Sequence, residues 1–184
     1  MLTYCQYVLL NPEDELNRIY HDTEYGFPLN EDNQLFERLV LEINQAGLNW
    51  SLILKKKDNF RRAYQDFDIN KVAKFDNDDF LRLMNDQGII RNRLKINAAI
   101  ENARIMQEIR KEYGSFKEWL DVHSNNSFQE LVKLFKKTFK FTGEQIVREF
   151  LLSTGYIPCA HDADCPVYQK ILSLEPPWMK FSAK

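Results

Sequence analysis

A carboxylate lies on what otherwise reads as a buried helix face. Leu35, Leu39 and Ala46 follow one another at spacings of four and seven residues, as on one side of an α-helix. Glu42 falls on the same stripe, three residues after Leu39. Either its charged head reaches water at the helix edge, or it lines an apolar pocket and needs a partner, because burying an unpaired charge is costly. A cationic ligand that carries hydrogen-bond donors would be such a partner.

Aromatic residues near Glu42 in the sequence could complete such a pocket. The helical pattern stops at Gly47, and Leu48 and Trp50 follow at once. Trp50 and Tyr20 could present ring faces to a cationic ligand. Ordinary core packing would explain both aromatic residues equally well.

Cysteines and histidines near the two chain ends form a candidate metal site. Cys5 and His21 lie near the N-terminus, and His161 and Cys165 lie four residues apart near the C-terminus. A zinc ion takes four such ligands tetrahedrally, and a closed site of this kind is structural. The spacing is not that of a zinc finger. The alternative is that the cysteines are small buried apolar residues and the histidines are surface groups.

The segment FKFTG at 139–143 joins two expected helices through a tight turn. Gly143 allows a close approach of the backbone, and the helix that follows offers free N–H groups to a phosphate. Lysines cluster before the turn, and Lys140 lies within it. The segment is therefore either a phosphate-binding hairpin or a simple connector.

Helices are the elements that must position these groups. No stretch of alternating polarity is long enough to predict a strand. Ser127 with Glu130, and Thr142 with Gln145, have the spacing of a capping box. We therefore expect one all-helical domain over residues 1–184. Cap and periodicity signals predict helices from Pro12 to Tyr20, from Asn30 past Glu42, from Trp50, over 59–65, over 78–85, from Asn92 to about Tyr113, from Ser115, from Ser127 and from Gly143 to Gly155.

The composition is that of a soluble globular protein. Of the 184 residues, 44% are hydrophobic and 28% are charged, and the net charge is −2. A net charge near zero does not by itself indicate nucleic-acid binding, although the lysines and arginines cluster locally. No apolar run predicts a membrane span or a signal peptide. Three cysteines suit a reducing cytoplasm better than a disulfide framework.

Several stretches together resemble the type I 3-methyladenine DNA glycosylase family. They follow the order of the family along nearly the whole chain. The matching stretches are Cys5, YHDTEYG at 20–26, LFERLVLEINQAGLNWSLILKKK at 35–57, FDINKVAKF at 67–75, GIIRNRLKINAAIENAR at 88–104, FKFTG at 139–143 and HDADC at 161–165.

This resemblance implies an all-α fold of the helix-hairpin-helix glycosylase class, in which one structural zinc ion joins the N- and C-terminal segments. It also implies hydrolysis of the N-glycosidic bond of 3-methyladenine in alkylated DNA. The implied zinc ligands are Cys5, His21, His161 and Cys165. The implied base-binding residues are Tyr20, Glu42, Trp50 and Tyr7, with Glu42 also the candidate catalytic residue. The expected DNA contacts are Gly47, Leu48, Lys140 and Gly143.

The chain departs from the family pattern at several positions, which alters the walls of the expected pocket. Tyr7 and Tyr25 stand where the family has tryptophan, and Asn17 replaces a tyrosine on the pocket side. Ile43 replaces a glycine that usually follows the key glutamate. These changes bear on which lesions the pocket accepts, 3-methylguanine among them.

The resemblance implies water as the nucleophile. Bifunctional members of the class use a lysine two residues after the second hairpin glycine, and Gln145 occupies that position here. The expected product is then an abasic site, and the expected partners are duplex DNA with alkylated bases and free 3-methyladenine. We expect a monomer in a cytoplasm of bacterial type.

Two other functions compete with this expectation. A non-catalytic DNA-binding module could keep the fold with an altered pocket. A zinc hydrolase would need an open coordination position, and four protein ligands leave none.

Overall fold

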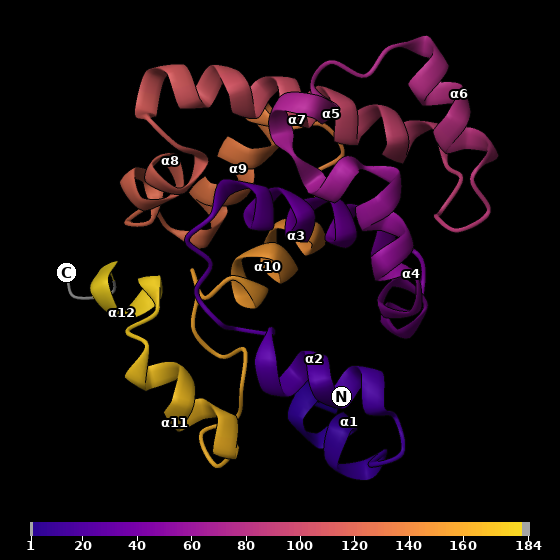
Figure 1. Cartoon of the computed structure of the whole chain (residues 1–184). Coiled ribbons are helices and arrows are strands. Elements are labelled where there is room, and N and C mark those ends of the chain that lie inside the picture. The colour runs from indigo at the N-terminus through magenta and orange to yellow at the C-terminus, as the bar shows by residue number, and fades with distance from the viewer. Residues whose placement is uncertain (1, 182–184) are drawn as a thin grey trace.

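The computed structural model describes residues 2–181, and within them the chain forms helices and no strand (Figure 1). This confirms the expected all-α class. The elements are α1 (Tyr4–Leu10), α2 (Glu15–Thr23), α3 (Asp32–Gln45), α4 (Trp50–Ala63), a 3-10 turn η1 (Gln65–Phe67), α5 (Ile69–Val72), α6 (Asn77–Asn85), α7 (Arg93–Tyr113), α8 (Phe116–His123), α9 (Phe128–Thr138), α10 (Glu144–Ser153), α11 (Pro166–Ser173) and α12 (Pro177–Phe181).

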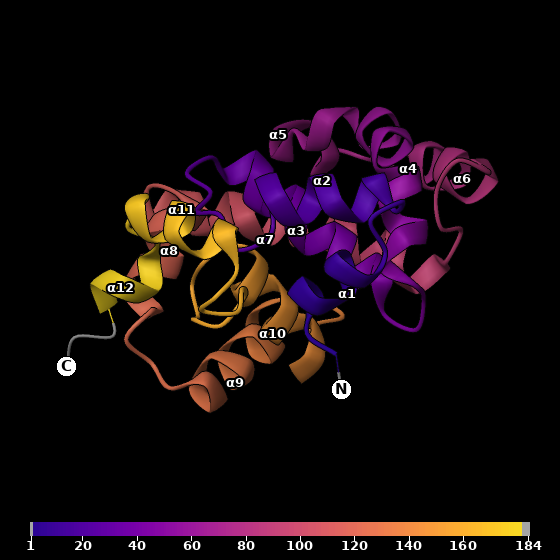
Figure 2. The ribbon, with the colours of Figure 1, turned by 90° about the horizontal axis from the view of Figure 1, so that it is seen from below.

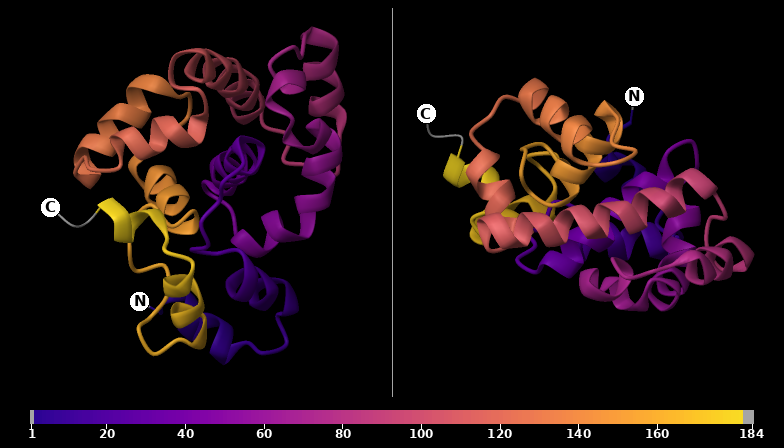
Figure 3. Two further views of the ribbon diagram at one scale, coloured as in Figure 1. Left: turned by 60° about the vertical axis from the view of Figure 1, so that its left-hand side comes forward. Right: turned by 90° about the horizontal axis from the view of Figure 1, so that it is seen from above.

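Helix α3 lies at the centre of the molecule, with the other helices arranged around it (Figure 3). It packs against α4, α7, α8 and α10. Its residues are buried nearly all the way round, as expected for a helix with neighbours on every side. Leu35 and Leu39 of the predicted stripe are fully buried, and so is nearly all of Glu42. The carboxylate is thus carried by a buried helix that has neighbours on several sides.

Both ends of α3 are fixed by charged side chains. At its start, the buried Asp32 accepts hydrogen bonds from the backbone N–H groups of Phe116 and Lys117, each at 3.0 Å, and thereby caps α8. At its end, the Lys95 ammonium donates to the carbonyls of Asn44 at 2.8 Å and Ala46 at 2.7 Å. A cation at the C-terminus of a helix is favoured by the helix dipole.

The N-terminal helices α1 and α2 and the C-terminal segment around α11 come together on one side of this core. Helices α1 and α2 lie beside α11, although more than a hundred residues separate them in sequence (Figures 1 and 2). The capping box of Thr3 and Gln6 starts α1, and Asp14 caps α2. This arrangement confirms the expectation that the N- and C-terminal segments meet.

Some helix boundaries differ from those that the sequence predicts. Helix α1 was not expected, and α2 begins at Glu15 rather than at Pro12. The residues 59–63 continue α4, because Asp58 lies within that helix and does not start a new one. The Thr142 hydroxyl does not cap α10 but donates to the carbonyl of Phe135 at 2.9 Å, so it closes the preceding turn.

Other signals are confirmed. Asn49 caps α4, and Asn92 caps the long α7, which ends at Gly114 with a positive φ of 90°. Ser127 and Glu130 form both hydrogen bonds of the predicted capping box. None of the described helices combines the length and the apolar character needed to cross a membrane.

Candidate functional site

A cavity of about 330 Å³ opens beside the C-terminal turn of α3. Its volume is within the range of small-molecule sites. Its lining combines aromatic rings with amide and carboxyl groups from five helices and the segment after α2. The lining residues are Tyr4, Tyr20, Tyr25, Glu42, Gln45, Trp50, Gln145 and Glu149. The structure thus brings three of the sequence-predicted residues, Tyr20, Glu42 and Trp50, to one cavity.

Tyr20 and Trp50 form an aromatic corner of the cavity. Their ring centroids lie 5.1 Å apart with planes inclined by 59°. The Arg38 guanidinium fixes Tyr20, because Nη1 donates to the phenol oxygen at 2.7 Å and also to the carbonyl of Ser153 at 3.2 Å. The corner therefore links α2, α3, α4 and the end of α10.

A second pair of tyrosines completes the aromatic wall. The rings of Tyr4 and Tyr25 meet edge to face, with centroids 5.1 Å apart. The Tyr4 hydroxyl donates to Oδ1 of Asn17 at 2.8 Å. The family pattern has a pocket-side tyrosine at position 17. Here the Asn17 side chain instead binds the hydroxyl of Tyr4 from α1. Sequence reasoning missed Tyr4, although it is the neighbour of the candidate ligand Cys5.

Glu42 is 4% exposed, so its charged form is poorly solvated. Burial raises the pKa of this carboxyl from its usual range to about 8, while the nearby Arg38 opposes the shift and Glu149 adds to it. At neutral pH the Glu42 carboxyl of the free protein therefore carries a proton. A cation placed in the cavity would favour ionisation of the same group.

Three polar lining residues were missed by the sequence analysis as pocket residues. Gln45 follows Glu42 by one helical turn on α3, a spacing that would have suggested it. Gln145 and Glu149 lie one turn apart on α10, and the Gln145 amide donates to Oε1 of Glu149 at 3.0 Å. Burial raises the pKa of the Glu149 carboxyl too, against the opposing effect of Arg148.

The remaining predicted base and DNA residues lie around the cavity. Tyr7 is not among the residues that line it; its ring stacks on Tyr4 at 6.3 Å and its hydroxyl donates to Asp14 at 2.9 Å. Gly47, exposed and with a φ of +78°, and the half-buried Leu48 form the loop between Gln45 and Trp50. This loop borders the cavity, because both residues that flank it line the cavity.

The turn at 139–143 joins α9 to α10 and is braced from the core. The fully buried Asn102 of α7 accepts from the Lys140 N–H at 2.7 Å and donates to the Lys140 carbonyl at 3.1 Å. The Lys140 side chain is exposed. Gly143 begins α10 without a side-chain cap, and no atom lies within 4 Å of the position that a Cβ would occupy there. The first amides of α10 are thus open to an anion.

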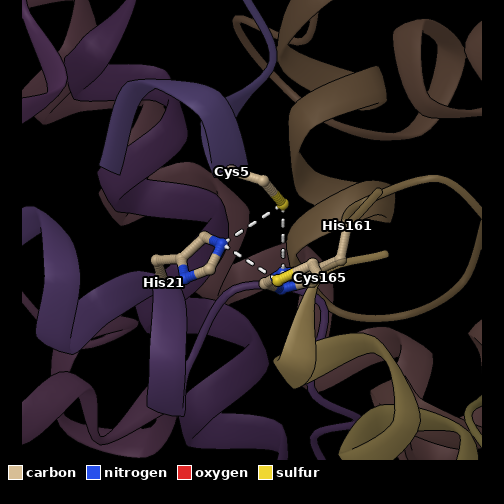
Figure 4. Close-up of side chains that lie close together, drawn as sticks. All are labelled: Cys5, His21, His161 and Cys165. Atoms are coloured by element: carbon tan, nitrogen blue, oxygen red, sulfur yellow. Dashed lines mark hydrogen bonds between the residues drawn. The ribbon is translucent and has the colours of Figure 1, made fainter. Parts of the chain in front are cut away.

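Four candidate metal ligands meet where the chain ends meet (Figure 4). Their donor atoms all lie within 4.8 Å of one another, so this group could hold a metal ion. The sulfur of Cys5 lies 3.3 Å from Nε2 of His21 and 3.6 Å from Nδ1 of His161. The sulfur of Cys165 lies 3.7 and 3.6 Å from the same two nitrogens.

These distances fit a tetrahedral ion. Bonds of about 2.3 Å to sulfur and 2.0–2.1 Å to nitrogen place S and N ligands roughly 3.6 Å apart at the tetrahedral angle. The outward nitrogens of both rings are also engaged: Nδ1 of His21 lies 2.7 Å from Asp22, and Nε2 of His161 lies 2.7 Å from the carbonyl of Tyr25. Such partners orient metal-binding imidazoles and leave the inward nitrogens free to bind the ion.

Comparisons with known proteins agree with this geometry. The family model for methyladenine glycosylases matches residues 10–131. The chain is 36% identical over 164 residues to DNA-3-methyladenine glycosylase 1 of Escherichia coli, covering 79% of this chain and 88% of that protein. The chain belongs to the methyladenine glycosylase family.

Further relatives extend the match beyond the region of the family model. DNA-3-methyladenine glycosylase of Haemophilus influenzae is 32% identical over 185 residues, covering 90% of this chain and 98% of that protein. The structure of 3-methyladenine DNA glycosylase I from Staphylococcus aureus, solved to explain its recognition of 3-methyladenine, superposes with a TM-score of 0.76. That structure is 34% identical in sequence to this chain, and the match covers 83% of this chain and 90% of that one.

Proposed function

We propose that this methyladenine glycosylase removes 3-methyladenine from alkylated duplex DNA by hydrolysing the N-glycosidic bond, and leaves an abasic site. The observation that carries this proposal is the cavity itself: an aromatic corner of Tyr20 and Trp50 faces the buried carboxyl of Glu42. A base must leave the duplex to reach such a cavity. The relatives named for this activity support the choice of substrate.

Recognition follows from the charge of the methylated base. Methylation at N3 makes the nucleoside cationic, so its rings stack well on the faces of Trp50 and Tyr20. Glu42 accepts a hydrogen bond from the base, and the positive charge of the base drives its carboxyl to ionise. An unmethylated adenine is neutral and cannot compensate the burial of that charge. Selectivity and binding thus come from the same buried group.

The chemical step requires little acid catalysis, because the cationic base is already a good leaving group. Water supplies the nucleophile. Gln145 occupies the position of the lysine that bifunctional members use, and an amide cannot form an imine with the sugar. The reaction therefore proceeds without a covalent intermediate between the enzyme and the DNA.

Contacts with DNA come from the exposed features around the cavity. The first amides of α10 after Gly143 and the Lys140 ammonium bind phosphates next to the lesion. Gly47 and Leu48 lie against the gap that the extruded base leaves in the duplex. The protein acts on duplex DNA as a monomer.

Zinc is the metal we propose for the cluster of Cys5, His21, His161 and Cys165. Thiolate and imidazole ligands in a tetrahedral arrangement are typical of zinc, and four protein ligands leave no position for a reactive water. The ion, when bound, supplies folding energy by joining the chain ends. No catalytic step depends on it.

Release of free bases from alkylated duplex DNA, separated and identified by chromatography, tests the proposed function. We expect 3-methyladenine to appear in excess over the 7-methylguanine that alkylation also produces. The DNA strand should stay intact until alkali is added. DNA binding without release of any methylated base would instead support the non-catalytic module, and strand cleavage without alkali would contradict the water mechanism.

A further inference from the structure

A second carboxylate faces the same cavity as Glu42. Glu149 lies on α10, whereas Glu42 lies on α3, and these two helices pack against each other. Glu149 is held by the Gln145 amide, which donates to its Oε1 at 3.0 Å, and the nearby Tyr25 hydroxyl lowers the pKa of its carboxyl. A salt bridge does not explain its position, since among the described residues no ion pair includes Glu149.

The two carboxyl groups lie at different depths. Glu42 and Tyr20 are almost fully buried and form the floor of the cavity, whereas Gln145 is exposed and Glu149 is half-buried. The α10 side is therefore the mouth. A flipped nucleotide keeps its phosphates outside and its base inside, so its sugar must lie at the mouth. Of the two carboxyl groups, Glu149 is therefore the one on the side from which the sugar would approach.

The environments divide the roles of the two groups. The more deeply buried Glu42 retains a proton up to a pKa of about 8, and the charge of Glu149 contributes to that shift. Burial also raises the pKa of Glu149, but its hydrogen bonds from Tyr25 and Gln145, and the Arg148 charge on its own helix, favour the ionised form. The Arg38 charge from α3 acts on Glu42. The pKa values of both carboxyls are raised, but the two groups differ in depth and in the polar groups around them, which suits them to different tasks.

We propose that Glu149 is a further catalytic residue, which binds the attacking water at the mouth of the cavity and accepts a proton from it. This inference rests on the proposed glycosylase function. The water oxygen bonds to C1′ of the sugar as the C1′–N9 bond breaks. The electron pair of that bond stays with the base and cancels its positive charge. One water proton passes to Glu149, and the other remains on the new hydroxyl group of the sugar.

The positions of the two carboxyls also explain why Glu42 does not perform this step. Its carboxyl contacts the base from the floor, and the base itself lies between it and the sugar. Glu42 selects the lesion, and Glu149 directs the water. The Tyr25 hydroxyl, which the tryptophan of the family pattern would lack, orients the Glu149 carboxylate.

Glu149→Gln tests the proposal, because it keeps the shape and the contact with Gln145 but cannot take up a proton. Three quantities are measured: the single-turnover rate of base release, the affinity for free 3-methyladenine from quenching of tryptophan fluorescence, and the dependence of the rate on pH. Glu149→Asp keeps the charge on a shorter side chain. Glu112→Gln is the matched control, since Glu112 is exposed near the far end of α7.

We expect Glu149→Gln to lower the single-turnover rate by about ten-fold or more, toward the low end of what positioned general bases contribute. Its affinity for free 3-methyladenine should not fall, and Glu149→Asp should recover part of the rate. In the wild type the rate should fall as acid protonates Glu149, and this acid limb should be absent from Glu149→Gln. Glu112→Gln should match the wild type in every measurement.

Three results would overturn the proposal while leaving the glycosylase function intact. Glu149→Gln could release base at the wild-type rate. It could lose rate and base affinity equally, which would make Glu149 a recognition residue. It could also lose rate and keep the acid limb, which would make its role structural. A wild-type protein that releases no base would refute the proposed function itself.

Discussion

The two polar sites of this molecule satisfy their buried groups in opposite ways. In the cluster of Cys5, His21, His161 and Cys165, the donor atoms all lie within 4.8 Å of one another, so one shared metal ion could satisfy them all. In the cavity, Glu42 is just as deeply buried but its carboxyl is left to a ligand that enters from outside. A polar site whose groups satisfy one another stabilises the fold. A polar site with an unsatisfied buried group favours binding of a ligand that satisfies it.

The two sites are built from neighbouring residues. Tyr4 of the cavity precedes Cys5, and Tyr20 of the cavity precedes His21. Tyr25 joins both sites, because its ring lines the cavity while its carbonyl accepts from His161 at 2.7 Å. The cluster therefore holds the tyrosine wall of the cavity in place. Breaking the cluster should damage the cavity, but the reverse should not hold.

The largest effect is expected from Cys165→Ala. Loss of one ligand should release the metal and the folding energy that it supplies, and so lower the melting temperature by roughly 10 °C or more for a chain of this size. Base release should fall as well, because the tyrosine wall loses its anchor. Thermal unfolding, metal analysis and the release assay measure these three outcomes.

Cys159→Ala is the matched control for this change. Cys159 is exposed and is not part of the cluster, so its replacement should leave metal content and melting temperature unchanged. Wild-type protein that contains no zinc after expression with ample zinc would refute the metal assignment. Equal effects of Cys159→Ala and Cys165→Ala would show that the loss is not specific to the cluster.

Glu42→Gln should make the free protein more stable and the enzyme less active. The folded-state pKa of about 8 lies above the value in the unfolded chain, so the wild type loses stability as pH rises between roughly 4.5 and 8. A neutral amide has no such loss. The variant should therefore gain on the order of 2–4 kcal/mol over the wild type by pH 8 and nothing at pH 4.

Denaturant unfolding at several pH values measures this gain, and the release assay measures the activity. Excision should fall without being abolished, because the methylated base leaves readily on its own. A stability difference that does not change with pH would show that Glu42 is ionised in the empty cavity. Wild-type activity in Glu42→Gln would exclude it from base recognition.

Trp50→Ala should weaken binding of the free base while the fold remains. Base–aromatic stacking is worth roughly 1–3 kcal/mol, so the affinity for 3-methyladenine should fall about ten-fold or more. Calorimetric titration measures the affinity without relying on the fluorescence that the change removes. The exposed Leu94→Ala serves as a control for loss of an apolar side chain. An unchanged affinity would mean that Trp50 belongs only to the core.

The fold was largely predictable from local signals. The Asn92 cap and Gly114 at the two ends of α7 were read correctly, because such signals depend on nearby residues alone. The apolar stripe likewise predicted that Glu42 lies beside a buried face. The Thr142 hydroxyl was misread because its partner is the Phe135 carbonyl in the preceding helix, which the spacing to Gln145 does not reveal. That residues 1–184 form a single domain stays a prediction.

The cavity was only half predictable. Tyr20, Glu42 and Trp50 came from their motifs, but Tyr4 and Glu149 enter the cavity through packing between segments far apart in sequence. An expectation transferred from the family placed Tyr7 at the base. The lining includes Tyr4, one helical turn earlier on α1, and the Tyr7 ring stacks on that of Tyr4 without being part of the lining. A contact between Tyr7 and the base stays a prediction. A resemblance to a family predicts which segments contribute to the cavity. Which side chain of a helical turn faces the cavity depends on how the helices pack.

The smallest effect is expected from Lys140→Glu. This change alters neither the cluster nor the cavity, but it weakens the attraction of DNA phosphates beside the cavity. The exposed Lys140 lies in the turn before α10, so it contributes attraction to phosphates without reading bases. Affinity should fall by a similar factor for all DNA sequences, and the slope of log K against log salt should become shallower by about one. Binding measured by fluorescence anisotropy at several salt concentrations gives both quantities. Lys111→Glu, at an exposed position near the far end of α7, should leave the slope unchanged.

The melting temperature of Lys140→Glu and its affinity for free 3-methyladenine should match those of the wild type, because neither the cluster nor the cavity includes this side chain. An unchanged salt slope would show that the turn at 139–143 is a connector, and that the duplex is held elsewhere around the cavity.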